Sequence, residues 1–213
     1  MPYPVHRLPE RLRAADALPK PASVPELSYG RHRGPAPPNA RLAAVAVTLF
    51  QAGGDWFIPL TLRPKSLQHH GGQVCFPGGR VESGETTLEA ALREFHEELG
   101  VPAQVQKPCG ELSTQYVYAS RNLVHPIVAI IDEPAAWDPD PIEVEQVISL
   151  PVSVLADHRR QVLITQQRRV ESGEGSIDHF TFRAPAYEFE DHLIWGATAL
   201  ILDQLAQILL SDV

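Results

Sequence analysis

Residues 79–101 read GRVESGETTLEAALREFHEELGV, a segment in which a glycine-rich start gives way to the hydrophobic period of a helix. Its apolar side chains recur at positions i, i+3, i+4, i+7 and i+11, namely Leu88, Ala91, Leu92, Phe95 and Leu99. This spacing predicts an amphipathic helix over residues 86–99. Thr86 followed by Glu89 is typical of a capping box, and Gly100 provides a helix stop. The predicted helix therefore has well-marked ends.

Three glutamates lie on the polar side of this predicted helix. Glu94 and Glu98 are one turn apart beside the edge of the apolar stripe, and Glu97 lies further round. An uncompensated pair of this kind destabilises a helix by about 0.2 to 0.5 kcal/mol. Such a face is most often simply solvated. If it holds a metal, oxygen donors without a nearby Cys or paired His favour Mg²⁺ or Mn²⁺ over zinc.

The surrounding spacing distinguishes these two interpretations. Gly79 is followed after five residues by Glu85, and after seven more by the run REFHEELGV at residues 93–101. This pattern resembles a complete Nudix box, the 23-residue signature of hydrolases that cleave a nucleoside diphosphate linked to another group. Phe95 departs from it, because the family usually has an aliphatic residue there, but it keeps the core period. The resemblance implies an α/β/α sandwich with a mixed sheet flanked by helices.

The resemblance also implies roles for the charged residues of the segment. Glu94, Glu97 and Glu98 would bind the metal, with Glu97 a further ligand or water activator, and Arg93 would complete the catalytic set. Arg93 and Glu85 would support one another, because a guanidinium can hold a carboxylate bidentately. The helical angle predicts that Arg93 points away from the metal pair.

A second motif lies just upstream. Arg63 and the run GQVCFPGG at residues 72–79 resemble the coenzyme A pyrophosphatase branch of the family. The substrate-binding residues implied are Arg63, Gly72, Phe76, Gly78 and Gly79. Pro64 and Gln68 depart from the branch pattern, in which a small and a basic residue are expected. Lys65, His69 or His70 could supply the missing charge. Gly79 would also let the loop backbone approach the site closely.

These resemblances imply metal-dependent hydrolysis of the diphosphate bond of coenzyme A or a derivative, giving 3′,5′-ADP and a 4′-phosphopantetheine compound. One alternative is another nucleoside diphosphate derivative, such as ADP-ribose or NADH. A second is a catalytically silent ligand sensor or scaffold. Glu143 and Glu145 are weak candidates for a general base in an acidic stretch. Cys75, beside Phe76, is expected to be core rather than a nucleophile.

The remaining pattern predicts more strands than helices, which favours a sheet covered by helices. A hairpin is expected from residues 42–50 and 56–62, with a turn at residues 52–55. Further strands are expected at residues 111–117, 123–131, 146–150, 161–166 and 179–183, and a closing helix at 194–210. In that helix, Trp195 would pack on one face with Thr198 and Leu202.

The composition of the chain limits its possible binding partners and indicates its cellular compartment. The 213 residues carry a formal charge of −8, which argues against a nucleic-acid coat and against binding to anionic lipid. The apolar runs are far shorter than the roughly 18 residues of a membrane span, so a soluble protein is expected. Cys75 and Cys109 show neither disulfide nor zinc spacing, which favours a reducing cytoplasm.

The first 40 residues differ from the rest. They hold nine of the 20 prolines and six basic against three acidic residues. We interpret residues 1–40 as an extended arm or surface wrap and residues 41–213 as the hydrolase domain. The arm is expected to pack on its own domain or on a twin subunit, which leaves a homodimer open.

Overall fold

The computed structural model describes residues 3–14, 36–67, 70–117, 120–171 and 177–210. One sheet has eight strands: β1 (Arg41–Ala52), β2 (Asp55–Leu62), β3 (Val74–Cys75), β4 (Gly78–Arg80), β5 (Val105–Glu111), β6 (Gln115–Val117), β7 (Asn122–Ile131) and β8 (Gln146–Pro151). A second sheet has three: β9 (Gln161–Glu171), β10 (Ile177–Phe189) and β11 (His192–Trp195). The helices are η1 (Val5–Arg7), α1 (Leu8–Ala14), α2 (Thr87–Leu99), α3 (Ser153–Ala156), η3 (His158–Arg160) and α4 (Ala197–Leu210).

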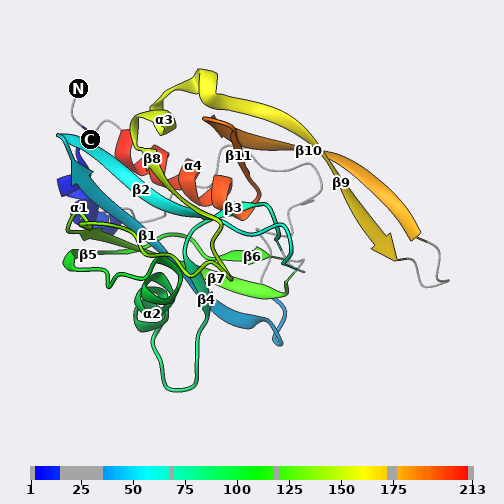
Figure 1. Ribbon diagram of the computed structural model, residues 1–213, viewed down its shortest axis with the longest axis horizontal. Coiled ribbons are helices and arrows are strands. Elements are labelled where there is room, and N and C mark those ends of the chain that lie inside the picture. The colour runs from blue at the N-terminus through cyan, green and yellow to red at the C-terminus, as the bar shows by residue number, and fades with distance from the viewer. Residues whose placement is uncertain (1–2, 15–35, 68–69, 118–119, 172–176, 211–213) are drawn as a thin grey trace.

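The large sheet is mixed. Its main path is β3-β2-β1-β7-β5, with β4 paired to β1, β6 to β7 and β8 to β2. β1 and β7 run parallel, whereas β1 and β2 form the expected antiparallel hairpin. Helices α2 and α4 lie on opposite sides of this sheet (Figure 1). The expected α/β architecture, a mixed sheet flanked by helices, is therefore confirmed.

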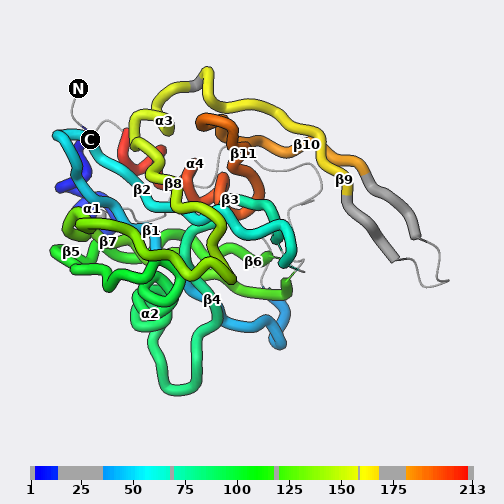
Figure 2. The backbone as a smooth tube through the Cα atoms, in the orientation of Figure 1, coloured from blue at the N-terminus to red at the C-terminus, as the bar shows by residue number. Residues whose placement is uncertain are grey.

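Alternation along β1 divides the core into two layers. Ala44 and Ala46 pack with Phe95 of α2, whereas Val47 and Leu49 pack on the other side with residues of α4. Neighbouring residues of a strand point to opposite faces, so one strand contributes to both layers. The tube in Figure 2 shows the sheet between the two helices. This arrangement holds α2 firmly against the sheet.

The ends of α2 follow the sequence prediction. The Thr86 hydroxyl accepts the Glu89 backbone N–H at 3.2 Å, and the Glu89 carboxylate accepts the Thr86 N–H at 2.8 Å. Gly100 has a left-handed φ of 70° and its N–H donates to the His96 carbonyl. The capping box and the glycine stop are both confirmed.

The predicted strand over residues 111–117 is wrong as a single element. Glu111 of β5 pairs with Ile127 of β7, and Gln115 of β6 pairs with Val124 of β7. Three residues therefore separate the paired positions on one chain segment, whereas only two separate them on β7. The Ser113 N–H leaves the ladder and donates to Gln204 Oε1 of α4 at 3.0 Å. A long-range contact thus interrupts a locally strand-like run.

The closing helix begins later than predicted. Trp195 belongs to β11, where it pairs with Ala186, and its ring lies 6.4 Å from that of Phe182. Gly196, with φ 69°, separates that strand from α4. The predicted helical face joining Trp195 to Thr198 is therefore wrong. The strands expected at 161–166 and 179–183 are confirmed as parts of the longer β9 and β10.

Part of the N-terminal segment is helical rather than extended. Val5 and Leu8 are fully buried, and the Arg11 guanidinium donates to the Ile208 and Leu209 carbonyls of α4 at 2.7 and 2.9 Å. This part of the segment packs on its own chain, while residues 15–35 lie outside the described residues. The division at residue 40 and the homodimer stay predictions. Within the described ranges, no helix is both long and apolar enough to cross a membrane.

Candidate active site

Glu98 lies where α2 meets the end of β2. Its side chain is only 3% exposed, because the helix face that carries it is pressed toward the sheet. Glu98 Oε1 lies 3.5 Å from Arg63 Nη1, and Oε2 lies 3.4 Å from the Thr61 hydroxyl. Burial raises the pKa of Glu98 to about 8, although Arg63 opposes the shift. A buried carboxylate with so raised a pKa is poorly compensated and fits a site for a cation.

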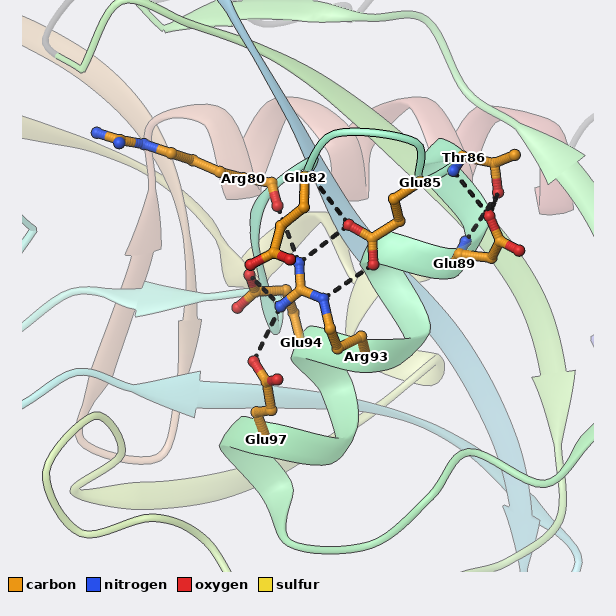
Figure 3. A network of polar contacts seen from close by, with 8 residues as sticks. All are labelled: Arg80, Glu82, Glu85, Thr86, Glu89, Arg93, Glu94 and Glu97. Carbon is orange, nitrogen blue, oxygen red and sulfur yellow. Dashed lines mark hydrogen bonds and ion pairs between the residues drawn. The ribbon is translucent and has the colours of Figure 1, made fainter.

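Arg93 ties the other carboxylates together (Figure 3). It grips Glu85 bidentately, from Nε at 2.9 Å and from Nη2 at 3.1 Å, as predicted. Its Nη1 also donates to Glu94 and Glu97, both at 2.9 Å, and its Nη2 to the Arg80 carbonyl at 3.0 Å. The hydrogen bond from Arg93 lowers the pKa of Glu85.

The prediction that Arg93 points away from the metal pair is therefore wrong for Glu94. The helical angle describes where a side chain leaves the backbone, and the long arginine stem then bends back along the helix. Burial raises the pKa of Glu94 despite this contact.

Gly78 and Gly79 let the loop pass close to both the sheet and the helix. A Cβ on Gly79 would collide with the Glu94 carboxylate. A Cβ on Gly78 would collide with the Ala44 carbonyl and with Val45 of β1. These close approaches explain why glycine stands at both positions. Phe76 is 4% exposed within the core, so its side chain supports this loop from the interior.

The loop between β2 and β3 begins at Arg63. The Arg63 N–H donates to the Gln73 carbonyl at 3.0 Å, and the Gly72 N–H donates to the Arg63 carbonyl at 2.9 Å. Gly72 has a left-handed φ of 73° and lies against the stem of Lys65. His70 Nδ1 lies 2.9 Å from Gln73 Oε1. Gln68 and His69 lie outside the described residues.

The acidic stretch after β7 covers the end of α2. The Asp138 and Asp140 N–H groups donate to the carbonyls of Leu99 and Glu98, both at 3.1 Å. These bonds satisfy helix-end acceptors that would otherwise lack partners. The stretch also brings Glu143 Oε2 to 3.6 Å from Arg63 Nη2. Of the two weak base candidates, Glu143 thus lies beside the site.

Sequence reasoning missed two supporting residues. Trp137 packs edge-on against Phe95 and Phe50, at ring distances of 6.1 and 5.9 Å, and anchors the acidic stretch. The only signal for it was a tryptophan inside an acidic run. Thr61, fully buried beside Glu98, lies in the strand that leads to Arg63, but its position among apolar residues indicates core rather than a site role.

Cys75 is not an activated nucleophile. Burial raises the pKa of its thiol to about 11, and reactive cysteines have lowered values. Its carbonyl oxygen lies 3.4 Å from the Thr61 hydroxyl, so the residue helps to hold β3 beside β2. Cys75 is half-buried and is not among the buried core residues of the described part of the chain, so the expected core role is not confirmed.

The carboxylates present a donor set that fits a hard divalent ion. Glu94, Glu97 and Glu98 share one helix and offer oxygen donors, which suit Mg²⁺ or Mn²⁺. Among the described residues, no three His, Cys, Asp or Glu side chains converge into a ready-made metal site. Arginines hold these carboxylates instead.

Comparison with known proteins identifies the family of this chain. The NUDIX domain family model matches residues 40–160, and the chain belongs to the Nudix family. "Nudix hydrolase 3" of Caenorhabditis elegans is 30% identical over 90% of this chain and 82% of its own. "Uncharacterized Nudix hydrolase NudL" of Photorhabdus laumondii is 32% identical over 81% of this chain and 90% of its own.

A solved structure agrees at the level of the fold. A MutT/nudix family protein from Enterococcus faecalis superposes with a TM-score of 0.50 at 14% identity, over 84% of this chain and 65% of that one. Family and relatives together define an enzyme, a Nudix hydrolase of nucleoside diphosphate derivatives.

Proposed function

We propose that this enzyme hydrolyses the diphosphate bond of coenzyme A or one of its derivatives, with Mg²⁺ or Mn²⁺. The observation that carries the proposal is the position of Arg63. Its guanidinium lies 3.5 Å from the Glu98 carboxylate, and its carbonyl accepts the Gly72 N–H at the start of the β2–β3 loop. A cation next to the metal carboxylates is suited to the phosphates of an anionic substrate. This loop is also the segment whose sequence resembles the coenzyme A pyrophosphatase branch.

The carboxylates of α2 bind the divalent ion in this proposal. Glu94, Glu97 and Glu98 hold it, and Arg93 orients Glu94 and Glu97 by hydrogen bonds. The ion, when bound, polarises phosphoryl oxygens and lowers the pKa of water. Glu97, which is 59% exposed, reaches solvent and is our candidate for accepting the proton of the attacking water.

The residues that we propose to bind the substrate lie in the β2–β3 loop and in the short segment from β3 to β4. Arg63 contacts phosphate oxygens, Gly72, Gly78 and Gly79 give the backbone close access, and Phe76 supports them from the core. The products are 3′,5′-ADP and a 4′-phosphopantetheine compound. We place this activity in a reducing cytoplasm, which the two free cysteines favour.

Gln68 favours a second substrate class, because it stands where the coenzyme A pyrophosphatase branch has a basic residue. ADP-ribose or NADH, which lack the 3′-phosphate of coenzyme A, would need less positive charge at that point.

A parallel assay separates these substrates. Purified enzyme is incubated with coenzyme A, ADP-ribose or NADH, each with Mg²⁺, Mn²⁺ or chelator, and the products are separated by chromatography. We expect metal-dependent release of 3′,5′-ADP from coenzyme A, lost in Glu98→Gln. Cleavage of ADP-ribose or NADH alone would overturn the coenzyme A assignment. Cleavage of none would favour a silent sensor or scaffold.

A further inference from the structure

Arg63 bridges two carboxylates that come from different elements. Its Nη1 lies 3.5 Å from Glu98 Oε1 on α2, and its Nη2 lies 3.6 Å from Glu143 Oε2 in the segment before β8. Both distances exceed those of a tight charge-assisted hydrogen bond, which are about 2.7 to 2.9 Å. Arg63 therefore acts here as a loosely held counter-ion.

The backbone of Arg63 is fixed by hydrogen bonds, whereas its guanidinium is held by two long ion pairs. Its N–H and carbonyl are bonded to Gln73 and Gly72 across the neck of the loop. The side chain is 21% exposed, so part of it is open to solvent. The guanidinium can thus move by rotation about side-chain bonds, without opening the loop.

The charges around Arg63 favour such a movement when a metal binds. Glu98 is nearly buried, and a bare carboxylate there needs a nearby positive charge. Arg63 lies close enough to supply that charge to the ionised form of Glu98, which is the form that a metal would bind. A divalent ion on Glu98 would supply more, and it would repel a guanidinium held beside the same carboxylate. An anionic substrate would then attract the displaced guanidinium.

We propose that Arg63 is an internal counter-ion that the metal displaces from Glu98, and that its displacement delivers the guanidinium to the substrate phosphates. This inference rests on the proposed metal-dependent function and deepens it. One side chain then couples the two binding events. Because such coupling is reciprocal, substrate also strengthens metal binding by the same factor.

Mn²⁺ affinity of the substrate-free enzyme tests the proposal. Free Mn²⁺ is followed by electron paramagnetic resonance in wild type, Arg63→Gln and Arg80→Gln. Arg80 is the matched control for net charge, because its exposed side chain points away from the carboxylates (Figure 3). We expect the Kd for Mn²⁺ to fall about threefold to tenfold in Arg63→Gln and to stay within about twofold in Arg80→Gln. An unchanged or higher Kd in Arg63→Gln overturns the proposal.

A second measurement leaves Arg63 in place. A dicarbonyl reagent modifies arginines of the wild-type enzyme, and mass spectrometry follows the peptide that contains residue 63. We expect Mn²⁺ to raise the modification rate several-fold, and Glu98→Gln to remove the increase. Equal rates with and without Mn²⁺ contradict the displacement.

The two proposals can fail separately. If the wild type binds no Mn²⁺, both the metal-dependent function and the displacement are wrong. If it binds Mn²⁺ and cleaves its substrate while Arg63→Gln leaves the affinity unchanged, only the displacement is wrong.

Discussion

At the residue scale, Glu98 makes the stability of the metal-free enzyme depend on pH. Its folded-state pKa is about 8, against an ordinary value of about 4.3 in the unfolded chain. Between these values the folded state binds a proton that the unfolded state lacks, so the free energy of unfolding falls as pH rises. We expect a loss of roughly a few kcal/mol, measured by urea unfolding in chelator from about pH 5 to 8.

Glu98→Gln is the matched control for this prediction, because glutamine keeps the shape and cannot ionise. Its unfolding free energy should fall less steeply over the same interval, and Mn²⁺ should flatten the wild-type curve by binding the ionised form. Parallel curves for wild type and Glu98→Gln would show that another group is responsible.

A substitution of Arg93 tests whether the geometry or the charge of this side chain matters for the glutamates that it contacts. Lysine keeps the positive charge but loses the planar fork that holds Glu85 while reaching Glu94 and Glu97. We expect Arg93→Lys to lower kcat by roughly tenfold or more, because the metal carboxylates lose their orientation. Steady-state kinetics at saturating metal measures this, with Arg80→Lys as the control. Wild-type kcat in Arg93→Lys would mean that charge alone suffices.

At the element scale, α2 was predictable because its determinants are local. The apolar period, the capping box and Gly100 lie within one segment, and the same segment carries the three glutamates that we propose as metal ligands. Elements defined by distant partners were not predictable. Ser113 leaves its strand for Gln204, which lies 91 residues further along the chain. The same holds for the site. Thr61 and Trp137 are distant from α2 in the sequence, and only the folded chain brings them into contact with Glu98 and Phe95.

The capping box of α2 should contribute to stability and little to catalysis. Thr86→Ala removes the acceptor for the Glu89 N–H and should lower the free energy of unfolding by about 1 kcal/mol. The cap lies slightly more than two turns before Glu94, and the sheet holds the helix along its length, so kcat should change little. Urea unfolding and kinetics on the same preparation measure both quantities. Thr87→Ala is the control, and an equal loss there would exclude a capping effect.

At the scale of the whole molecule, the N-terminal helix is part of the enzyme's own core. Leu8 is fully buried in the core layer that contains the apolar residues of α4, and its helix α1 contacts both β5 and α4. Arg11 adds hydrogen bonds to the final carbonyls of α4. Residues far apart in the chain thus close the second layer, which predicts that this segment stabilises the domain without entering the chemistry.

Leu8→Ala should therefore lower the free energy of unfolding by about 2 to 5 kcal/mol, because it leaves a cavity in the core. Below the unfolding transition, kcat should stay near that of wild type. Arg13→Ala is the control, since Arg13 bonds only locally to Pro9 among the contacts of the described residues, and it should change stability by less than about 0.5 kcal/mol. Protein concentration adds a second criterion. If the segment packs within one chain, the loss is the same at every concentration, whereas a segment that joins two copies would make the melting temperature rise with concentration.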